Sequence, residues 1–527
     1  MIYHCEDHTC NYWDEGEKLP ERCPQCGRKL LRANETDMTG DDWTALGNTL
    51  WDAEASDKKR MVDCFRKAAY LGSAWGVCNL GICMEQGNGV EADPVQAFWL
   101  YQQAVEMGSL NAVCCLGVCY QYGIGTAPDA EKAAELYCKA AEYGSPRGQM
   151  LLARAFHDGI GVEADAAEAV HWVRAAAYQR YGEGMHRLGV CYEYGDGVEQ
   201  NWEHAVHWFR EAAESGVSMA MTDLGYCYEK GCGVEQSWEQ AFSWYRRGAE
   251  CGYPVSMSNL GLCYKRGYGV EQNWQEAIKW YEQGAQCGDL QSMHNLACCY
   301  EHGEGVEQNM TEAIRWYTAA AEGGNADAMH DLGWHYDHGE GVEQDMKKAI
   351  CWYERAAEQN HPAAMNSLGE CYAMGRGVPR DLETAMEWYR RAAELGEAMA
   401  DYNMGWHLEQ AGKLSEAYAH YRKAADGNDD SAWWALGRFY ENGVVVAQDG
   451  KEARRCYETG EKLGSVKCKM RLARCKLLGI GGRREKKAGL DLCRQALELA
   501  KESSEKEDYG YEAEMNLLRR TIAENES

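Results

Sequence analysis

The chain has 527 residues, and 45% hydrophobic with 26% charged residues is an ordinary composition for a globular protein. Its 83 acidic and 54 basic residues give a net charge of -29, which should repel phosphate backbones and anionic lipid surfaces and argues against nucleic acid or membrane partners. The N-terminal sequence lacks the features of a secretion signal, and no run approaches the roughly 18 apolar residues that span a bilayer, so we expect a cytoplasmic protein.

Residues 1–33 predict a small metal-binding head. Two cysteine pairs stand there, and the second pair has the Cys-x-x-Cys-Gly sequence that is typical of a zinc knuckle. The four predicted ligands are Cys5, Cys10, Cys23 and Cys26. A segment of about 30 residues is too short to hold a core without a metal, so we expect structural Zn²⁺ in a closed site. The head looks like a zinc ribbon or rubredoxin-like knuckle; iron, a redox dithiol at the second pair, or His4 or His8 as a ligand are the alternatives.

Residues 40–505 repeat with a period of 36 residues. The motif Leu-Gly-x-x-Tyr recurs at this spacing, beginning at Leu188, Leu224, Leu260, Leu332 and Leu368. Apolar residues at helical spacing predict a first helix, A, and a Gly-x-Gly pair predicts a turn through positive φ. An Asn, Ser or Asp cap followed by Trp-Tyr predicts a second helix, B. About thirteen such helix-turn-helix repeats predict an all-α, α/α superhelical solenoid, with residues 506–527 as a capping helix and tail.

The pattern resembles the Sel-one-like repeat family, a relative of the tetratricopeptide repeats. The resemblance rests on Leu-Gly-x-x-Tyr, on the Gly-x-Gly-Val turn, and on Lys-Ala or Glu-Ala followed by Trp-Tyr. It implies a scaffold or adaptor that binds proteins or peptides. Cysteine-rich secreted members pair a cysteine that ends helix B with one eight residues later, but Cys251 and Cys287 are followed at that distance by Asn259 and Asn295. This departure weakens the alternative of a secreted effector or hydrolase-like (β-lactamase-like) repeat protein.

Side chains inside the array that could carry chemistry have simpler explanations. Cysteines at one equivalent position of helix A are expected to be unpaired core residues, because equivalent positions of stacked repeats are too far apart to form a disulfide. Ser-x-x-Lys occurs at Ser56 and Ser503, as chance allows, and the common nucleotide, zinc-protease and serine-hydrolase motifs are absent. We expect core and turn roles, and not metal binding, for His294, His302, His330, His335 and His338. The sequence therefore does not predict an enzyme.

The predicted partner surface is the side of the A helices opposite the Leu-Cys-Tyr core. Side chains vary between repeats there, and solenoids use such concave surfaces for extended ligands. Aromatic rings beside Asn amides could hold a peptide by stacking and hydrogen bonding, although the same side chains could instead pack between helices. The predicted partner-binding residues are Tyr226, Asn259, Asn295, Trp334, Asn403 and Trp406.

Overall fold

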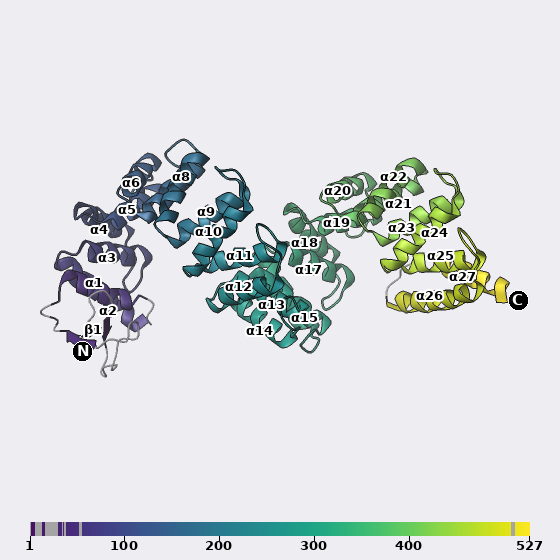
Figure 1. The fold of residues 1–527 in the computed structure, drawn as a ribbon, viewed down its shortest axis with the longest axis horizontal. Coiled ribbons are helices and arrows are strands. Elements are labelled where there is room, and N and C mark those ends of the chain that lie inside the picture. Colours follow the sequence, from purple (N-terminus) through teal and green to yellow (C-terminus); the bar gives the residue numbers. More distant parts are fainter. Residues whose placement is uncertain are drawn as a thin grey trace. The chain divides into compact units, whose positions relative to one another are not determined.

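A computed structural model describes residues 2–5, 13–15, 30–33, 35, 38–51, 55–506 and 512–526. These residues form 27 helices and three short strands (Figure 1). The chain divides into two compact units, Met1–Asn273 and Trp274–Ser527. No helix in the described ranges combines the length and the apolar character that crossing a membrane requires.

Three antiparallel strands open the first unit, with β1 (Ile2–Cys5) between β2 (Trp13–Glu15) and β3 (Leu30–Ala33). The pairing places Tyr3 opposite both Asp14 and Arg32. The sequence analysis did not predict this sheet. Cys5 ends β1, whereas Cys10, Cys23 and Cys26 lie outside the described residues. The zinc-binding head therefore stays a prediction.

Paired helices build the rest of the first unit. Its A helices are α1 (Gly40–Thr49), α3 (Ala74–Gln86), α5 (Leu110–Tyr122), α7 (Pro146–Asp158), α9 (Gly182–Tyr194), α11 (Ser218–Lys230) and α13 (Pro254–Arg266). Its B helices are α2 (Ala55–Tyr70), α4 (Pro94–Glu106), α6 (Ala130–Glu142), α8 (Ala166–Tyr178), α10 (Trp202–Glu214) and α12 (Trp238–Glu250). Each of these B helices packs against the A helix before it and the A helix after it.

The second unit continues the alternation. Its B helices are α14 (Trp274–Gln286), α16 (Met310–Gly323), α18 (Met346–Glu358), α20 (Leu382–Glu394), α22 (Leu414–Asp426), α24 (Gly450–Lys462) and α26 (Lys486–Lys506). Its A helices are α15 (Leu290–His302), α17 (Ala326–His338), α19 (Pro362–Met374), α21 (Ala398–Gln410), α23 (Asp430–Asn442) and α25 (Val466–Leu478). A last helix, α27 (Glu512–Glu526), packs on α25 and α26 through Met515 and Leu518. The repeated helix pairs confirm the predicted all-α solenoid.

The Gly-x-Gly turn fixes the direction change between helices A and B. Gly231 ends α11 with φ of 73°, and its N–H donates to the carbonyl of Cys227. Gly233 also has positive φ, at 69°, a conformation that glycine adopts without steric cost. The repeat that begins with α23 has Val445 at the second glycine position, and this valine is held at φ of 63°. Most turns of the array therefore need glycine, and one repeat tolerates strain instead.

The core lies between the A and B helices of each repeat. Leu224 and Cys227 of α11 are buried, and a Cβ on Gly225 would lie 2.6 Å from Cε1 of Tyr245 on α12. Glycine at this position thus lets the tyrosine ring pack directly on the A-helix backbone. The equivalent cysteines are buried and free, which confirms the predicted core role, at Cys83, Cys119, Cys191, Cys227, Cys263, Cys299, Cys371 and Cys475.

Candidate functional site

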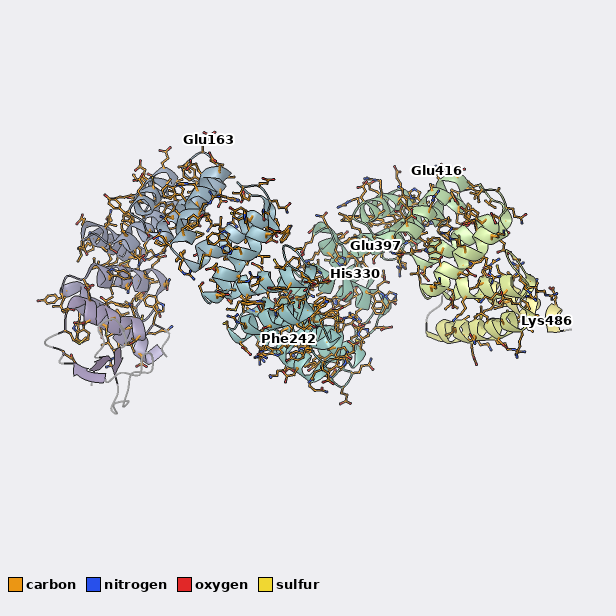
Figure 2. The ribbon with its side chains drawn as sticks, in the orientation of Figure 1. Glu163, Phe242, His330, Glu397, Glu416 and Lys486 are labelled. Carbon is orange, nitrogen blue, oxygen red and sulfur yellow. The ribbon has the colours of Figure 1, made fainter. Side chains whose placement is uncertain are left out.

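The A helices form the inner face of each unit. Several pairs of neighbouring A helices contact each other directly, for example α3 with α5 and α23 with α25, whereas contacts between neighbouring B helices are weaker among the described residues. Helices approach most closely on the inner side of a curved stack. The predicted partner-binding residues all lie on A helices, and Figure 2 shows side chains along both units, with His330 labelled on α17.

Polar side chains connect successive A helices at a fixed offset of 37 residues, and we call these pairs the A-helix rungs. In the first unit, Nε2 of His186 donates to Oδ2 of Asp223 at 2.6 Å. In the second unit, Nδ2 of Asn403 donates to Oδ1 of Asn366 at 3.0 Å. Two further rungs in the second unit are His294 with Asp331, at 2.9 Å, and His330 with Ser367, at 3.4 Å. The rungs help to hold neighbouring repeats in register.

The aromatic members of the predicted partner surface are partly open to solvent. Tyr226 in the first unit is 43% exposed, and Trp406 in the second unit is 38% exposed. Trp334 is half-buried and stacks on His338, with ring centroids 4.3 Å apart. These three residues stand at the same repeat position, so each presents its ring from the same place on its A helix.

The Asn amides of the predicted surface are half-buried and are partly used inside the array. The Nδ2 group of Asn403 donates both to Asn366 and to Oε1 of Glu370, the latter at 3.2 Å. Oδ1 of Asn295 accepts a hydrogen bond from Gln291 at 3.4 Å. A ligand at Asn403 would therefore meet mainly its carbonyl oxygen. The role of Asn259, Asn295 and Asn403 in binding stays a prediction.

Three of the clustered histidines have the structural roles that the sequence predicts. His335 is 1% exposed and replaces the core cysteine, with Nδ1 3.1 Å from the carbonyl oxygen of Glu340. His302 and His338 lie at the ends of their A helices, just before glycine turns. Their Nδ1 atoms lie 3.0 and 2.9 Å from the carbonyl oxygens of Cys298 and Trp334. These three side chains therefore have structural roles, in the core and at helix ends.

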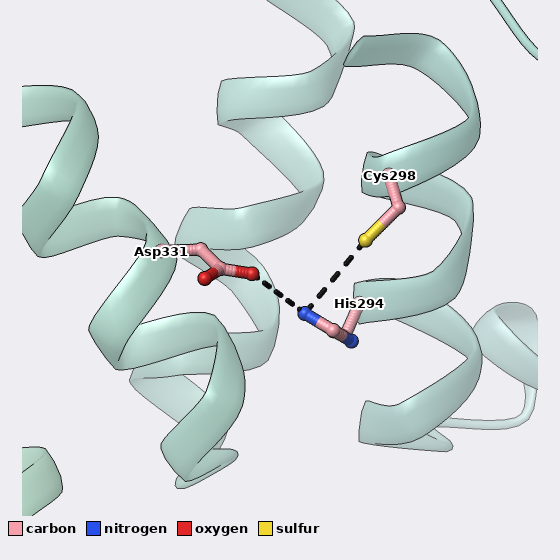
Figure 3. A group of neighbouring side chains, drawn as sticks. All are labelled: His294, Cys298 and Asp331. Atoms are coloured by element: carbon pink, nitrogen blue, oxygen red, sulfur yellow. Dashed lines mark hydrogen bonds and ion pairs between the residues drawn. The ribbon is translucent and has the colours of Figure 1, made fainter. Parts of the chain in front are cut away.

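His294 has different surroundings, because it meets both Cys298 on its own helix and Asp331 on α17 (Figure 3). Its Nε2 lies 2.9 Å from Oδ2 of Asp331 and 3.8 Å from Sγ of Cys298. Burial disfavours the imidazolium, but the hydrogen bonds to Asp331 and Cys298 outweigh it and raise the pKa of His294 to about 10. Burial would raise the pKa of Asp331, but His294 and His330 hold it well below its ordinary value.

This cluster was not predicted from the sequence, although one signal was available. His294 and Cys298 are four residues apart, which places them on one face of a helix. The arrangement is not that of a cysteine nucleophile with an oriented base, because Asp331 and Cys298 approach the same nitrogen. A catalytic relay needs the carboxylate on the other ring nitrogen. Ser56 and Ser503 lie on α2 and α26, far apart in the chain.

The first unit also holds a pocket of about 400 Å³ between α7, α8 and α9. His157 and Arg187 line it, but Nε2 of His157 lies 3.2 Å from Oδ2 of Asp196 and Nη2 of Arg187 lies 3.8 Å from the same oxygen. Because its basic groups are paired with a carboxylate inside the pocket, this pocket has little free charge to offer an anionic ligand.

Comparison with protein families gives twelve matches along the array. The family model described as Sel1 repeat matches residues 76–109, 112–145, 146–181, 182–217, 218–253, 254–289, 290–325, 326–361, 362–397, 398–429, 432–465 and 466–501. These matches overlap every A helix from α3 to α25. A comparison with curated proteins gives no match.

Two solved structures that resemble this chain come from bacteria. A protective antigen of uropathogenic Escherichia coli strains, described as displaying an SLR fold, is 29% identical, with a TM-score of 0.55. The alignment covers 88% of this chain and 90% of that one. A Sel1 repeat protein from Oxalobacter formigenes is 31% identical over 46% of this chain and 96% of that chain, with a TM-score of 0.43.

Proposed function

Because this chain belongs to the Sel1 repeat family, we propose that it is a protein-interaction scaffold that binds extended segments of partner proteins on its inner A-helix face. Solenoid proteins commonly bind extended ligands on such continuous surfaces. A likeness of 29% identity over most of both chains to an antigen with an SLR fold supports the same architecture.

One observation carries this proposal: a large side chain recurs at a single repeat position of the inner face and stays partly exposed. Tyr226, Leu262 and Trp406 are 43%, 37% and 38% exposed at that position. Aromatic and large apolar side chains that are already ordered by a scaffold lose little entropy on binding. This position therefore offers anchors for apolar side chains of a partner at Tyr226 and Leu262 in the first unit and at Trp334 and Trp406 in the second.

Charge should narrow the choice of partner. The net charge of -29 favours association with protein segments that carry Lys or Arg between apolar residues, and it disfavours nucleic acid. Tyr226 already has Lys230 5.8 Å from its ring centroid, so the surface itself accepts a cation beside an aromatic ring. Basic-apolar segments are thus the expected ligand class.

The test is affinity capture with the full chain, followed by quantitative mass spectrometry of the bound proteins. The Trp334→Ala, Trp406→Ala double variant removes two rings of the inner face. Trp99→Ala is the matched control, because Trp99 is 56% exposed on a B helix. We expect partners to be lost from the double variant and kept by the control. Equal recovery of the same partners by both variants would refute binding on the inner face.

We also propose that the head binds structural Zn²⁺ through Cys5, Cys10, Cys23 and Cys26. The support is the spacing of the cysteines and the shortness of the segment. The full chain and a Cys23→Ser, Cys26→Ser variant should differ by one bound ion, measured by elemental analysis. An unchanged ion count would exclude this ligand set, and iron in place of zinc would correct the choice of metal.

A further inference from the structure

We propose that His294, Cys298 and Asp331 bind one Zn²⁺ ion at the junction of two neighbouring repeats. The three side chains come from α15 and α17, the A helices of successive repeats in the second unit. The proposal does not rest on the proposed function or on the head, because it depends only on the arrangement of these side chains (Figure 3). Cys298 itself stands at the repeat position that carries Tyr226 and Trp406 on the partner surface.

The donor atoms are already gathered around one point. One nitrogen, one sulfur and one carboxylate oxygen lie within 4.8 Å of one another. Nε2 of His294 is 2.9 Å from the Asp331 oxygen and 3.8 Å from the Cys298 sulfur. In a tetrahedral site with bonds of about 2.0–2.3 Å, ligand atoms are separated by about 3.3–3.8 Å. Small side-chain movements would therefore convert the cluster into three corners of a zinc tetrahedron.

Two of the proposed ligands have a further neighbour that holds them in place. Oη of Tyr317, which donates to Oε2 of Glu301, lies 3.3 Å from Sγ of Cys298. Nδ1 of His330 lies 3.1 Å from Oδ1 of Asp331. Zinc ligands are usually oriented by outer hydrogen bonds of this kind, which fix the ring or carboxylate and tune its basicity. The cluster therefore has a supporting shell as well as donors.

The chemistry of the donors selects the metal. Imidazole nitrogen, thiolate and carboxylate are the three ligand types that Zn²⁺ accepts, whereas Mg²⁺ and Ca²⁺ take oxygen ligands. A thiolate and a carboxylate would neutralise the two positive charges of the ion. The His294 side chain is 13% exposed and that of Asp331 is 33% exposed, so an ion can enter from solvent. Three protein donors leave the fourth position for water.

The chain contains its own comparison for this site, three repeats earlier. His186 and Asp223 form the equivalent rung, with Nε2 and Oδ2 2.6 Å apart, but the position of the cysteine is Val190. The position of Tyr317 is Phe209 in that repeat. A His–Asp rung alone is thus a structural link between repeats. Cys298 is the addition that makes the second rung a proposed metal site, whereas Tyr317 is the tyrosine that most B helices carry at this position.

The experiment compares ion binding by the full chain and by variants of the two rungs. Metal is removed with a chelator under reducing conditions, and Co²⁺ is titrated as a spectroscopic probe before competition with Zn²⁺. Cys298→Val reproduces the natural rung at Val190, and Asp331→Ala removes a second donor. Each variant should lose one ion per chain relative to wild type, together with part of the cobalt–thiolate absorption. Helix content by circular dichroism verifies that the variants fold.

Retention of the full ion count by both folded variants would overturn the proposal. The converse change, Val190→Cys with Phe209→Tyr, transplants the missing donor and its hydroxyl partner to the first rung. This chain should gain one ion, and a chain that gains none would also count against the proposal. The gain does not depend on the folding of the Cys298 or Asp331 variants. The head contributes equally to all these chains, so differences in ion count report the rungs.

Discussion

The tyrosine hydroxyl that links helix B to helix A offers a direct test of how each repeat is held together. Oη of Tyr245 donates to Oε2 of Glu229 at 2.8 Å, and Tyr457 makes the same bond to Glu441 at 2.8 Å. The repeat of α9 and α10 has Phe209 at this position. The carboxyl group opposite Phe209 is that of Glu193, and burial together with Asp223 raises its pKa. Exchanging Phe and Tyr at these two positions should therefore have opposite effects.

A hydrogen bond to a charged group contributes about 1.5–3 kcal/mol. Nζ of Lys230 lies 2.8 Å from the other oxygen of Glu229, so the carboxylate keeps one partner when the hydroxyl is removed. We expect Tyr245→Phe to cost about 1.5 kcal/mol, near the lower end of that range. Phe209→Tyr should stabilise its repeat by a similar amount at neutral pH.

The raised pKa of Glu193 also fixes the direction in which the effect of Phe209→Tyr should change with pH. A carboxyl whose folded pKa is raised contributes stability below its unfolded pKa and loses it as pH rises through the folded pKa. A hydroxyl donor beside Glu193 should reduce that loss, so Phe209→Tyr should stabilise more at pH 7 than at pH 4.

The assay is native-state hydrogen exchange, which reports the free energy of opening of each helix pair in the full chain. Protection of α11 and α12 should fall in Tyr245→Phe, and protection of α9 and α10 should rise in Phe209→Tyr. Unchanged protection in both variants would refute the assignment of the hydroxyl bond as a stabilising link. A gain in Phe209→Tyr that is equal at both pH values would refute the role of Glu193.

Three further outcomes follow from burial and backbone geometry. Burial raises the pKa of Asp429 to about 6, so the wild-type chain loses stability as this carboxyl ionises between pH 4 and pH 8. Asp429→Asn keeps a capping oxygen and avoids this loss. Over this pH range its free energy of unfolding, measured in urea, should therefore rise by about 2–3 kcal/mol relative to that of the wild type. Gly161→Ala should cost at least about 2 kcal/mol more than Gly144→Ala, because both have positive φ but only the former Cβ overlaps a backbone carbonyl. Cys251 is exposed, whereas Cys227 is buried and burial raises its pKa to about 12. An alkylating reagent at pH 8 should therefore modify Cys251 before Cys227, as followed by mass spectrometry. The reverse order would contradict the packing of Cys227 in the core.

The repeat fold was accessible from the sequence because its determinants are local. Leu224, Gly225 and Tyr245 belong to one repeat and contact each other inside it, so the 36-residue period carries the information for both helices and for the turn. The core cysteines could be predicted for the same reason, because they recur at one position of the repeat. Val445 shows what the sequence could not predict about the turn. The missing glycine indicates that this turn differs from the others, but it does not show that the backbone keeps its positive φ.

The cluster at His294 could not be predicted from the repeat pattern in the same way. Its third member, Asp331, is 37 residues away, one more than the period, and this offset depends on how one A helix is shifted along the next. A pattern search at the exact period pairs His294 with His330 instead. The same offset explains why Asn403 is engaged by Asn366, although the sequence suggested that its amide was open to a ligand.

Neighbour-only packing has a mechanical consequence. Because the A and B helices of a repeat contact mainly the adjoining helices, tension applied along the chain would be transmitted from repeat to repeat in series. A repeat of 36 residues, such as 146–181, would extend to about 120 Å once it yields. The array should therefore lengthen in discrete steps under load, with the weakest repeat opening first and the others still folded.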